Sequence, residues 1–196
     1  MQIPVTRATP DRLPVLIEVV ARAFMVEPAM RWPFGDSETD HLQRLRVAFG
    51  ALDETFIRLG LMYEAANGVG CAVWVPPGSD AGARAGEESV ETFHALCDDG
   101  GARYDRFWAW VESHHLDEPH WYLNQVAVDP AHQGHGLGAA LVEVGLQQAR
   151  ETRAPAFLVA AQPRNVGYYE RFGFRTVFDG DPPDGGPHCW FMRYDA

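Results

Sequence analysis

The stretch HQGHGLGAALVEVG at residues 132–145 places Gly134, Gly136 and Gly138 directly before an apolar helical pattern. Glycine has no side chain, so the backbone of such a loop can approach a phosphate group closely. A helix that begins near residue 137 also has unpaired N–H groups and a partial positive charge at its N-terminus. The sequence therefore predicts a phosphate-binding loop, and the compound that carries the phosphate decides the function.

Gly134, Gly136 and Ala139 also satisfy G-x-G-x-x-(G/A), the fingerprint of dinucleotide-binding oxidoreductases. That fingerprint opens the first strand–helix unit of its fold, whereas this loop lies two-thirds along a short chain. It also needs an acidic residue about 20 positions later to hold the ribose, but residues 154–162 read APAFLVAAQ. A nucleoside triphosphate loop would need Gly-Lys-Ser or Gly-Lys-Thr, which is absent from the sequence. A turn that serves only chain geometry is the structural alternative.

Gln133, Gly136 and Gly138 fit a different spacing, (Gln/Arg)-x-x-Gly-x-(Gly/Ala). On this spacing, VAVDPAHQGHGLGAALVEVGLQQA resembles the pyrophosphate-binding core motif of the GNAT N-acetyltransferase superfamily, and AFLVAAQPRNVGYYERFGF resembles the motif that follows it. The two motifs cover about residues 124–175, in the order and at the separation typical of that superfamily. Four further segments, AFMVEPAMRW, AVWVPPG, EPHWYL and GPHCWFM, resemble the subgroup that contains puromycin N-acetyltransferase.

The resemblance implies one acetyltransferase domain over residues 1–196 with an α/β (α+β) fold. Helices would flank a mixed, mostly antiparallel twisted sheet with a splayed central strand pair. That pair is expected at residues 120–128 and 156–161, where it would hold the pantetheine arm of acetyl-CoA, the implied cosubstrate. Because the chain has a net charge of −11, oriented backbone groups must provide the site for this polyanion locally.

The same resemblance implies which residues contact acetyl-CoA. Backbone groups of Val126, Ala127 and Val128 would hold the pantetheine arm, and a backbone N–H there would stabilise negative charge on the thioester oxygen. Asn165 matches the family's cofactor-contacting asparagine, and a helix N-cap is its structural alternative. The complete expected set is Val126, Ala127, Val128, Gln133, Gly134, His135, Gly136, Leu137, Gly138, Ala139 and Asn165.

The implied reaction is direct acetyl transfer from the thioester to a primary amine, without a covalent enzyme intermediate. Tyr169, four residues before Gly173, occupies the family's general-acid position. A phenol with a pKa of about 10 suits protonation of a leaving thiolate. A core tyrosine whose hydroxyl is satisfied by another partner is the structural alternative.

The general base is left open by the sequence. Strand alternation places residues 120–125 on two faces, with His120, Tyr122 and Asn124 on one and Trp121, Leu123 and Gln125 on the other. Some members of the family place a Glu or His on this strand, where Tyr122 or Asn124 stands in this chain. The candidates are therefore His120, or Glu118 acting through water, and the amine arriving in its neutral form is the alternative.

The resemblance places the acceptor pocket at the loop between the first two helices. Met30, Trp32 and Phe34 from this loop, with Tyr122 and Asn124 from the strand, are the expected substrate contacts. Aromatic and acidic side chains there suit an amine with an apolar or aromatic group, and plain packing of the loop is the structural alternative. The predicted acceptor is a small-molecule amine, such as a puromycin-like aminonucleoside or another antibiotic. A protein or peptide acceptor, and an acyl-CoA sensor without turnover, are the alternatives.

Composition limits the other partners. The net charge of −11 over 196 residues disfavours nucleic acid and mildly favours cationic small molecules. No apolar run approaches the ~18–20 residues of a membrane span, and the N-terminus lacks the pattern of a signal peptide. Three separated cysteines predict reduced thiols and a cytoplasmic location. We expect no metal site, because His114, His115 and His120 lack ligand spacing, and a monomer or homodimer.

A mixed set of helices and strands must position these residues. Apolar spacing predicts helices over residues 10–27, 38–59, 88–98, 101–115, 137–151 and 165–172. Strands are predicted over residues 61–66, 71–77, 120–128, 156–161, 174–179 and 188–194, with Asn67-Gly68 as a hairpin turn. Residues 27–36 are predicted as a loop, and residues 78–89, which lack large apolar side chains, as a mobile loop.

Overall fold

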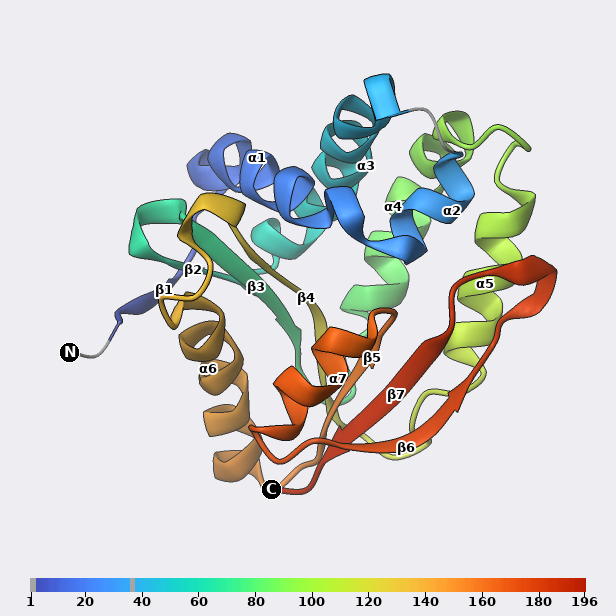
Figure 1. Ribbon diagram of the computed structural model, residues 1–196. Coiled ribbons are helices and arrows are strands. Elements are labelled where there is room, and N and C mark those ends of the chain that lie inside the picture. Colours follow the sequence, from blue (N-terminus) through green and yellow to red (C-terminus); the bar gives the residue numbers. More distant parts are fainter. Residues whose placement is uncertain (1–2, 36–37) are drawn as a thin grey trace.

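The computed structural model describes residues 3–35 and 38–196, which form a seven-stranded sheet in the order β1-β2-β3-β4-β5-β7-β6 (Figure 1). Neighbouring strands are antiparallel except β4 and β5, which are parallel. The strands are β1 (Val5–Arg7), β2 (Met62–Ala65), β3 (Gly70–Val75), β4 (Trp121–Val128), β5 (Ala156–Ala160), β6 (Arg175–Gly180) and β7 (Cys189–Tyr194). The mixed, mostly antiparallel sheet expected from the motifs is confirmed.

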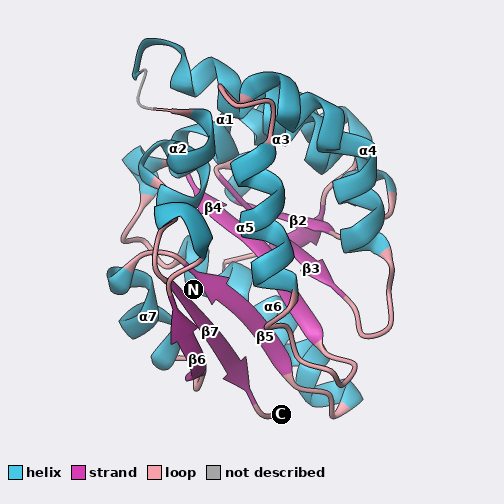
Figure 2. Cartoon of the chain, turned by 90° about the vertical axis from the view of Figure 1, so that its right-hand side faces the viewer, coloured by secondary structure: helices cyan, strands magenta, loops and turns pink. Residues whose placement is uncertain are grey.

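Helices cover both faces of the sheet (Figure 2). One face carries α1 (Leu13–Ala23), α2 (Pro28–Phe34), α3 (Glu38–Arg58), α4 (Ala81–Leu96) and α5 (Ala102–Glu112), and the other carries α6 (Leu137–Thr152) and α7 (Pro163–Glu170). Each face buries its own core: Leu16, Phe56 and Val73 belong to the first, and Trp74 and Leu141 to the second. Among the described residues, no helix is long and apolar enough to cross a bilayer.

Two segments predicted as loops are helical. Residues 27–36 contain α2, which begins at Pro28, a residue whose fixed φ suits the first helical position, and ends before Gly35 at φ 78°. Residues 78–89 contain the first half of α4, which buries Ala81, Ala85 and Ser89 against the core. The small residues of that segment form a helix because they pack on α3, a tertiary contact that composition does not reveal.

The central strands β4 and β5 separate soon after they begin to pair. Their ladder joins Trp121 to Ala156 and Tyr122 to Phe157, and no pair beyond these two links the strands in the described chain. The backbone of β4 after Tyr122 is therefore free of β5, and a slot opens between the strands. The splayed pair expected at residues 120–128 and 156–161 is present.

A β-bulge in β4 changes which residues face the helices. On β3, Val73 pairs with Gln125 while the next residue, Trp74, pairs with Leu123, so Asn124 has no partner of its own. An extra residue of this kind interrupts the alternation of faces. Gln125 consequently lies on the α3 side, while Leu123 packs with α6. The expectation that Gln125 shares a face with Leu123 is wrong for this reason.

Candidate active site

The glycine loop leads into α6 and leaves the start of that helix open. Residues 133–136 are exposed, and Gly136 is the N-cap residue of α6, at φ 82° and without a side-chain cap. Gly134 has φ 81°, and a Cβ built there would meet nothing within 4 Å. Both glycines therefore supply a left-handed backbone that other residues rarely adopt. The N–H groups of the first helical turn lack helical partners and suit a polyanion.

The side chains of the loop fold back onto the protein. Gln133 donates from Nε2 to the carbonyl oxygen of Val128 at 3.2 Å, which ties the loop to the end of β4. His135 donates from Nδ1 to the carbonyl oxygen of His132 at 3.2 Å. Leu137 is buried in the α6 core, so only its backbone is available to a ligand. This arrangement fits a pyrophosphate held mainly by backbone groups.

Gly138 has a packing role that sequence reasoning missed. A Cβ at this position would lie 2.8 Å from Oη of Tyr168, a residue of α7. Glycine therefore leaves room for the Tyr168 hydroxyl beside α6. Ala139, the next residue of α6, is half-buried, and its N–H belongs to the same open turn.

The slot between β4 and β5 contains a cavity of about 200 Å³. Four of the expected cofactor contacts line this cavity, Val126, Val128, Gln133 and Asn165, and so does Tyr169, the expected general acid. Ala127 alternates to the opposite face of β4 and is buried in the core beneath α1. Asn165 is not the N-cap of α7, because Gln162 occupies that position. Its side chain is thus available at the cavity wall.

Tyr169 and Glu27 line this same cavity from opposite ends of the sequence. Burial raises the pKa of Tyr169 well above its usual range, and the neighbouring Tyr168 and Glu27 add to this effect. The phenol is therefore protonated at neutral pH and can donate a proton. Burial also raises the pKa of the Glu27 carboxyl group, which accepts a hydrogen bond from Nε2 of Gln162 at 2.8 Å. A carboxylate with a raised pKa is a better base near neutral pH.

The sequence interpretation did not single out Glu27 as a catalytic candidate. One signal was available: an acidic residue stands immediately before Pro28 within the otherwise apolar AFMVEPAM. Its hydrogen-bond partner, Gln162, is 135 residues away in the chain, and no local pattern shows that contact.

A second and larger cavity, of about 810 Å³, adjoins the first. The two cavities share wall residues around the β4 bulge: Phe24, Met30, Trp108, Val111, Tyr122, Asn124 and Gln125. The remaining walls come mainly from α3, α4, α5 and the segment that precedes β4. A compound in the larger cavity can therefore reach the slot at the bulge.

The two bases considered from the sequence lie at the larger cavity. His120 donates from Nδ1 to the carbonyl oxygen of Glu118 at 2.8 Å, which leaves the Nε2 lone pair of the neutral ring available. The Glu118 carboxylate forms an ion pair with Arg193 of β7. In the described structure both side chains line the 810 Å³ cavity, and neither lines the smaller cavity that contains Tyr169.

The expected acceptor contacts divide into two groups. Met30, Tyr122 and Asn124 line both cavities, whereas neither Trp32 nor Phe34 belongs to the described walls. Trp32 packs against Phe107 with ring centroids 6.1 Å apart, and Phe34 is 1% exposed within the core.

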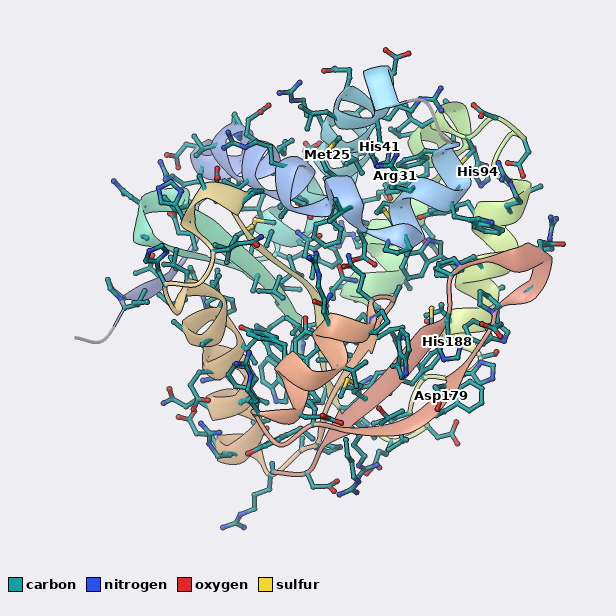
Figure 3. All side chains as sticks on the ribbon, viewed as in Figure 1. Met25, Arg31, His41, His94, Asp179 and His188 are labelled. Atoms are coloured by element: carbon teal, nitrogen blue, oxygen red, sulfur yellow. The ribbon has the colours of Figure 1, made fainter. Side chains whose placement is uncertain are left out.

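The position of Met30 at the cavities depends on how α2 is held. Arg31 of α2 donates from Nη1 to the carbonyl oxygen of Met25 at 3.3 Å, and Figure 3 shows these residues beside His41 of α3. The bond joins α2 to the segment that follows α1. The helix that replaces the expected loop is thus tied to the segment that leads into it, and its Met30 lines both cavities.

Comparisons with known proteins agree with this geometry. The sequence model of the acetyltransferase (GNAT) family matches residues 59–174, more than half of the chain. A putative acetyltransferase of Bacillus subtilis (strain 168) is 27% identical over 73 residues, which make up 37% of this chain and 50% of that protein. The matched region thus spans half the length of this relative.

Solved structures share the fold along the whole chain. A crystal structure of histone acetyltransferase HPA2 and related acetyltransferase from Corynebacterium glutamicum ATCC 13032 is 26% identical, with a TM-score of 0.71 over 100% of this chain and 98% of that one. Drosophila melanogaster polyamine N-acetyltransferase, which forms N-acetylagmatine, is 16% identical with a TM-score of 0.60 over 100% of both chains. PaiA N-acetyltransferase from Thermoplasma acidophilum, in complex with coenzyme A, is 12% identical with a TM-score of 0.59 over 100% of both chains.

The family match contains the glycine loop, both splayed strands and α7, which carries Tyr169. The structural match along the whole chain, with its TM-score of 0.71, agrees with the mixed seven-stranded fold. This chain belongs to the GNAT family of acetyltransferases.

Proposed function

We propose that this chain is an acetyl-CoA-dependent N-acetyltransferase that transfers acetyl directly to the primary amine of a small molecule. We also propose that residues 1–196 form one domain for this reaction. One observation carries the proposal: Tyr169 and Glu27 line one cavity in the slot between β4 and β5, and this cavity meets a larger one at the β4 bulge. A proton donor and a proton acceptor thus stand where the two substrates would meet.

The slot and the glycine loop fit the cosubstrate. Acetyl-CoA would supply the acetyl group as a thioester. The open first turn of α6, with Gly134 and Gly136 before it, would bind the pyrophosphate. The unpaired backbone of β4 would bind the pantetheine arm, and a backbone N–H near the bulge at Asn124 would donate to the thioester oxygen. Asn165 would add a side-chain contact from α7.

The Glu27 carboxylate and the Tyr169 phenol would each carry out one of the two proton transfers. Glu27 would accept a proton from the ammonium group of the acceptor, because burial raises the pKa of Glu27 toward that of a useful base. Tyr169 would donate its Oη proton to the leaving thiolate, because burial keeps the phenol protonated. His120 and Glu118 are the competing bases, and they would act from the wall of the larger cavity.

The larger cavity supports a small-molecule acceptor. A volume of about 810 Å³ falls within the range of drug-sized ligand sites, roughly 300–1,000 Å³. Its walls carry aromatic side chains together with Glu112 and Asp117, whose charge favours an ammonium group. A puromycin-like aminonucleoside is the more specific acceptor that we propose.

The test is the release of free coenzyme A thiol from acetyl-CoA, with and without a panel of primary amines that includes puromycin. Amine-dependent release supports N-acetyl transfer, and release with puromycin supports the specific acceptor. Release with other amines alone would exclude a puromycin-like acceptor and would still support an N-acetyltransferase. Binding of coenzyme A without release by any amine would contradict the proposal and favour a protein acceptor or an acyl-CoA sensor.

A further inference from the structure

Helix α4 contributes an unusually open wall to the larger cavity. Gly82, Ala83 and Gly86 line this cavity from two successive turns of the helix. A Cβ built at Gly82 or at Gly86 would meet nothing within 4 Å. This wall therefore carries no side chain larger than a methyl group, and a larger residue at either glycine would extend into open space beside the cavity.

The fold itself does not require either glycine. Glycine within a helix is unfavourable relative to alanine because the unfolded chain loses more conformational freedom. Gly145 of α6 shows the opposite case, because a Cβ there would lie 2.0 Å from Cε2 of Trp74. Gly82 and Gly86 have neither such a neighbour nor a positive φ. Space in the cavity is what the two glycines preserve.

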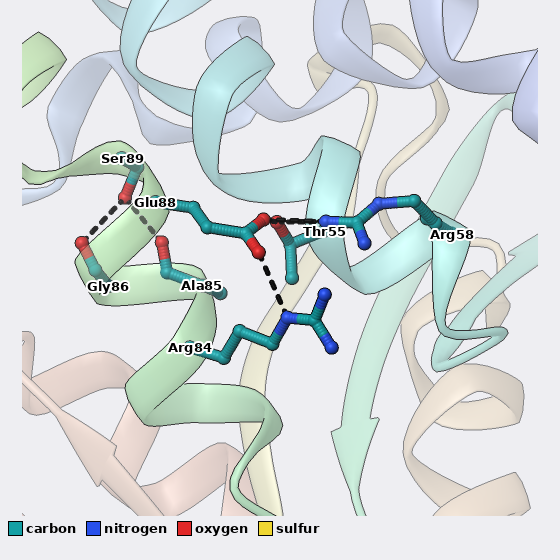
Figure 4. A network of polar contacts seen from close by, with 7 residues as sticks. All are labelled: Thr55, Arg58, Arg84, Ala85, Gly86, Glu88 and Ser89. Atoms are coloured by element: carbon teal, nitrogen blue, oxygen red, sulfur yellow. Dashed lines mark hydrogen bonds and ion pairs between the residues drawn. The ribbon is translucent and has the colours of Figure 1, made fainter.

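The rest of α4 is held firmly against α3 (Figure 4). Glu88 accepts hydrogen bonds from Thr55 and Arg58 of α3, and from Nε of Arg84 at 2.9 Å. Ser89 donates from Oγ to the carbonyl oxygen of Ala85 at 2.7 Å. Because these contacts fix the helix, the open wall does not result from a helix that stands away from its neighbours.

A polar residue at the β4 bulge also lines this cavity. Gln125, at the β4 bulge, lines the cavity, is 5% exposed, and donates from Nε2 to Asp53 at 2.9 Å. Its Oε1 has no hydrogen-bond partner in the described structure. Phe93, Tyr104 and Trp108 supply aromatic walls to the same cavity. One cavity thus combines a polar end at the bulge with an apolar, aromatic region beside the glycines of α4.

We infer that the α4 wall formed by Gly82, Ala83 and Gly86 determines acceptor specificity, by admitting the bulky aromatic body of a primary amine whose amino group lies at the β4 bulge. This inference rests on the proposed function and names the class of its acceptor. Amines without a bulky body do not reach the α4 wall, so contacts there do not strengthen their binding.

The experiment compares 4-phenylbenzylamine with propylamine in wild-type protein and in the variants Gly82→Leu and Gly86→Leu. Leucine fills the wall, so we expect KM for 4-phenylbenzylamine to rise about 10-fold or more, while kcat/KM for propylamine is unchanged. Glu91→Leu, at an exposed position of α4 outside the cavity, is the matched control and should leave both amines unaffected. The melting temperature should not fall, because leucine favours a helix over glycine.

The inference would be overturned if the leucine variants lost activity toward both amines to the same extent, or toward neither. Binding is measured separately from turnover, as the rise in melting temperature that 4-phenylbenzylamine causes in the presence of coenzyme A. Wild-type protein that shows this rise without any acetyl transfer would fail the proposed function. The role of the α4 wall would still be supported in that case if both leucine variants lost the rise in melting temperature. If wild-type protein acetylates propylamine but shows no such rise with 4-phenylbenzylamine, the role of the α4 wall is contradicted.

Discussion

Gln125 donates a hydrogen bond from Nε2 to Oδ1 of Asp53 at 2.9 Å, and this bond joins the bulge of β4 to helix α3. Asp53 is fully buried, and burial raises the pKa of its carboxyl group to about 7. In the described structure, its second oxygen and Oε1 of Gln125 have no hydrogen-bond partner. A buried carboxyl group whose hydrogen bond comes from a neutral amide is easier to bury protonated than ionised.

Replacing Asp53 by Asn should change how stability depends on pH. Between the usual carboxyl pKa near ~4 and the folded value of about 7, the folded state holds a proton that the unfolded state has lost. Stability therefore falls as pH rises through this window, and Asp53→Asn removes that fall. The gain over wild type should grow from pH 4 to 7 and reach at most about 4 kcal/mol, at about 1.4 kcal/mol per unit.

Urea unfolding at several pH values measures this difference. Asp40→Asn, which changes an exposed carboxyl group of the same helix, is the control and should follow the wild-type curve. Parallel stability curves for Asp53→Asn and wild type would show that Asp53 is ionised in the folded protein.

Replacing Tyr169 by Phe should remove the proposed proton donor and keep the packing of the ring. We expect kcat to fall by about 10²–10⁴-fold, the usual contribution of a general acid. KM for acetyl-CoA should change little, because the phenol acts on the leaving thiolate rather than in binding. Steady-state kinetics with Tyr168→Phe as the neighbouring control would test this, and equal rates for the two variants would remove Tyr169 from the proton transfer.

Replacing Glu27 by Gln should abolish the acidic limb of the pH–rate profile. The carboxylate can accept a proton only when ionised, so the wild-type rate rises with pH through the Glu27 pKa, which burial places above its usual range. Glutamine still accepts the hydrogen bond from Gln162, which preserves the local structure. The profile of kcat/KM against pH should therefore lose this limb and fall in magnitude.

His120→Gln and Glu118→Gln provide the comparison for Glu27, since each removes one of the competing bases. Both variants should keep the acidic limb. Loss of the limb in either variant, with the limb intact in Glu27→Gln, would transfer the role of base to the wall of the larger cavity.

The sequence predicted the features that depend on local pattern. The turn at Gly134 and Gly136 and the helix that carries Tyr169 follow from glycine placement and apolar spacing within short segments. The side of β4 on which Gln125 lies depends instead on a bulge set by pairing with β3. The hydrogen bond that Glu27 accepts comes from Gln162 in a distant segment. Contacts between segments decide such positions, and spacing along the chain does not record them.

Gly138 offers a test of packing against ligand contact. A Cβ at Gly138 would lie 2.8 Å from Oη of Tyr168, and this crowding, worth about 1 kcal/mol or more, offsets the gain of about 1 kcal/mol that alanine brings to a helix over glycine. Gly138→Ala alone should therefore not stabilise the protein, and adding Tyr168→Phe should raise its stability by removing the hydroxyl. In that double variant, an unchanged KM for acetyl-CoA would assign Gly138 to helix packing alone. A raised KM would show that the bare backbone at Gly138 also contacts the pyrophosphate. Denaturant unfolding and steady-state kinetics on the four combinations separate the two roles, because stability reports the helix contact and KM reports the ligand.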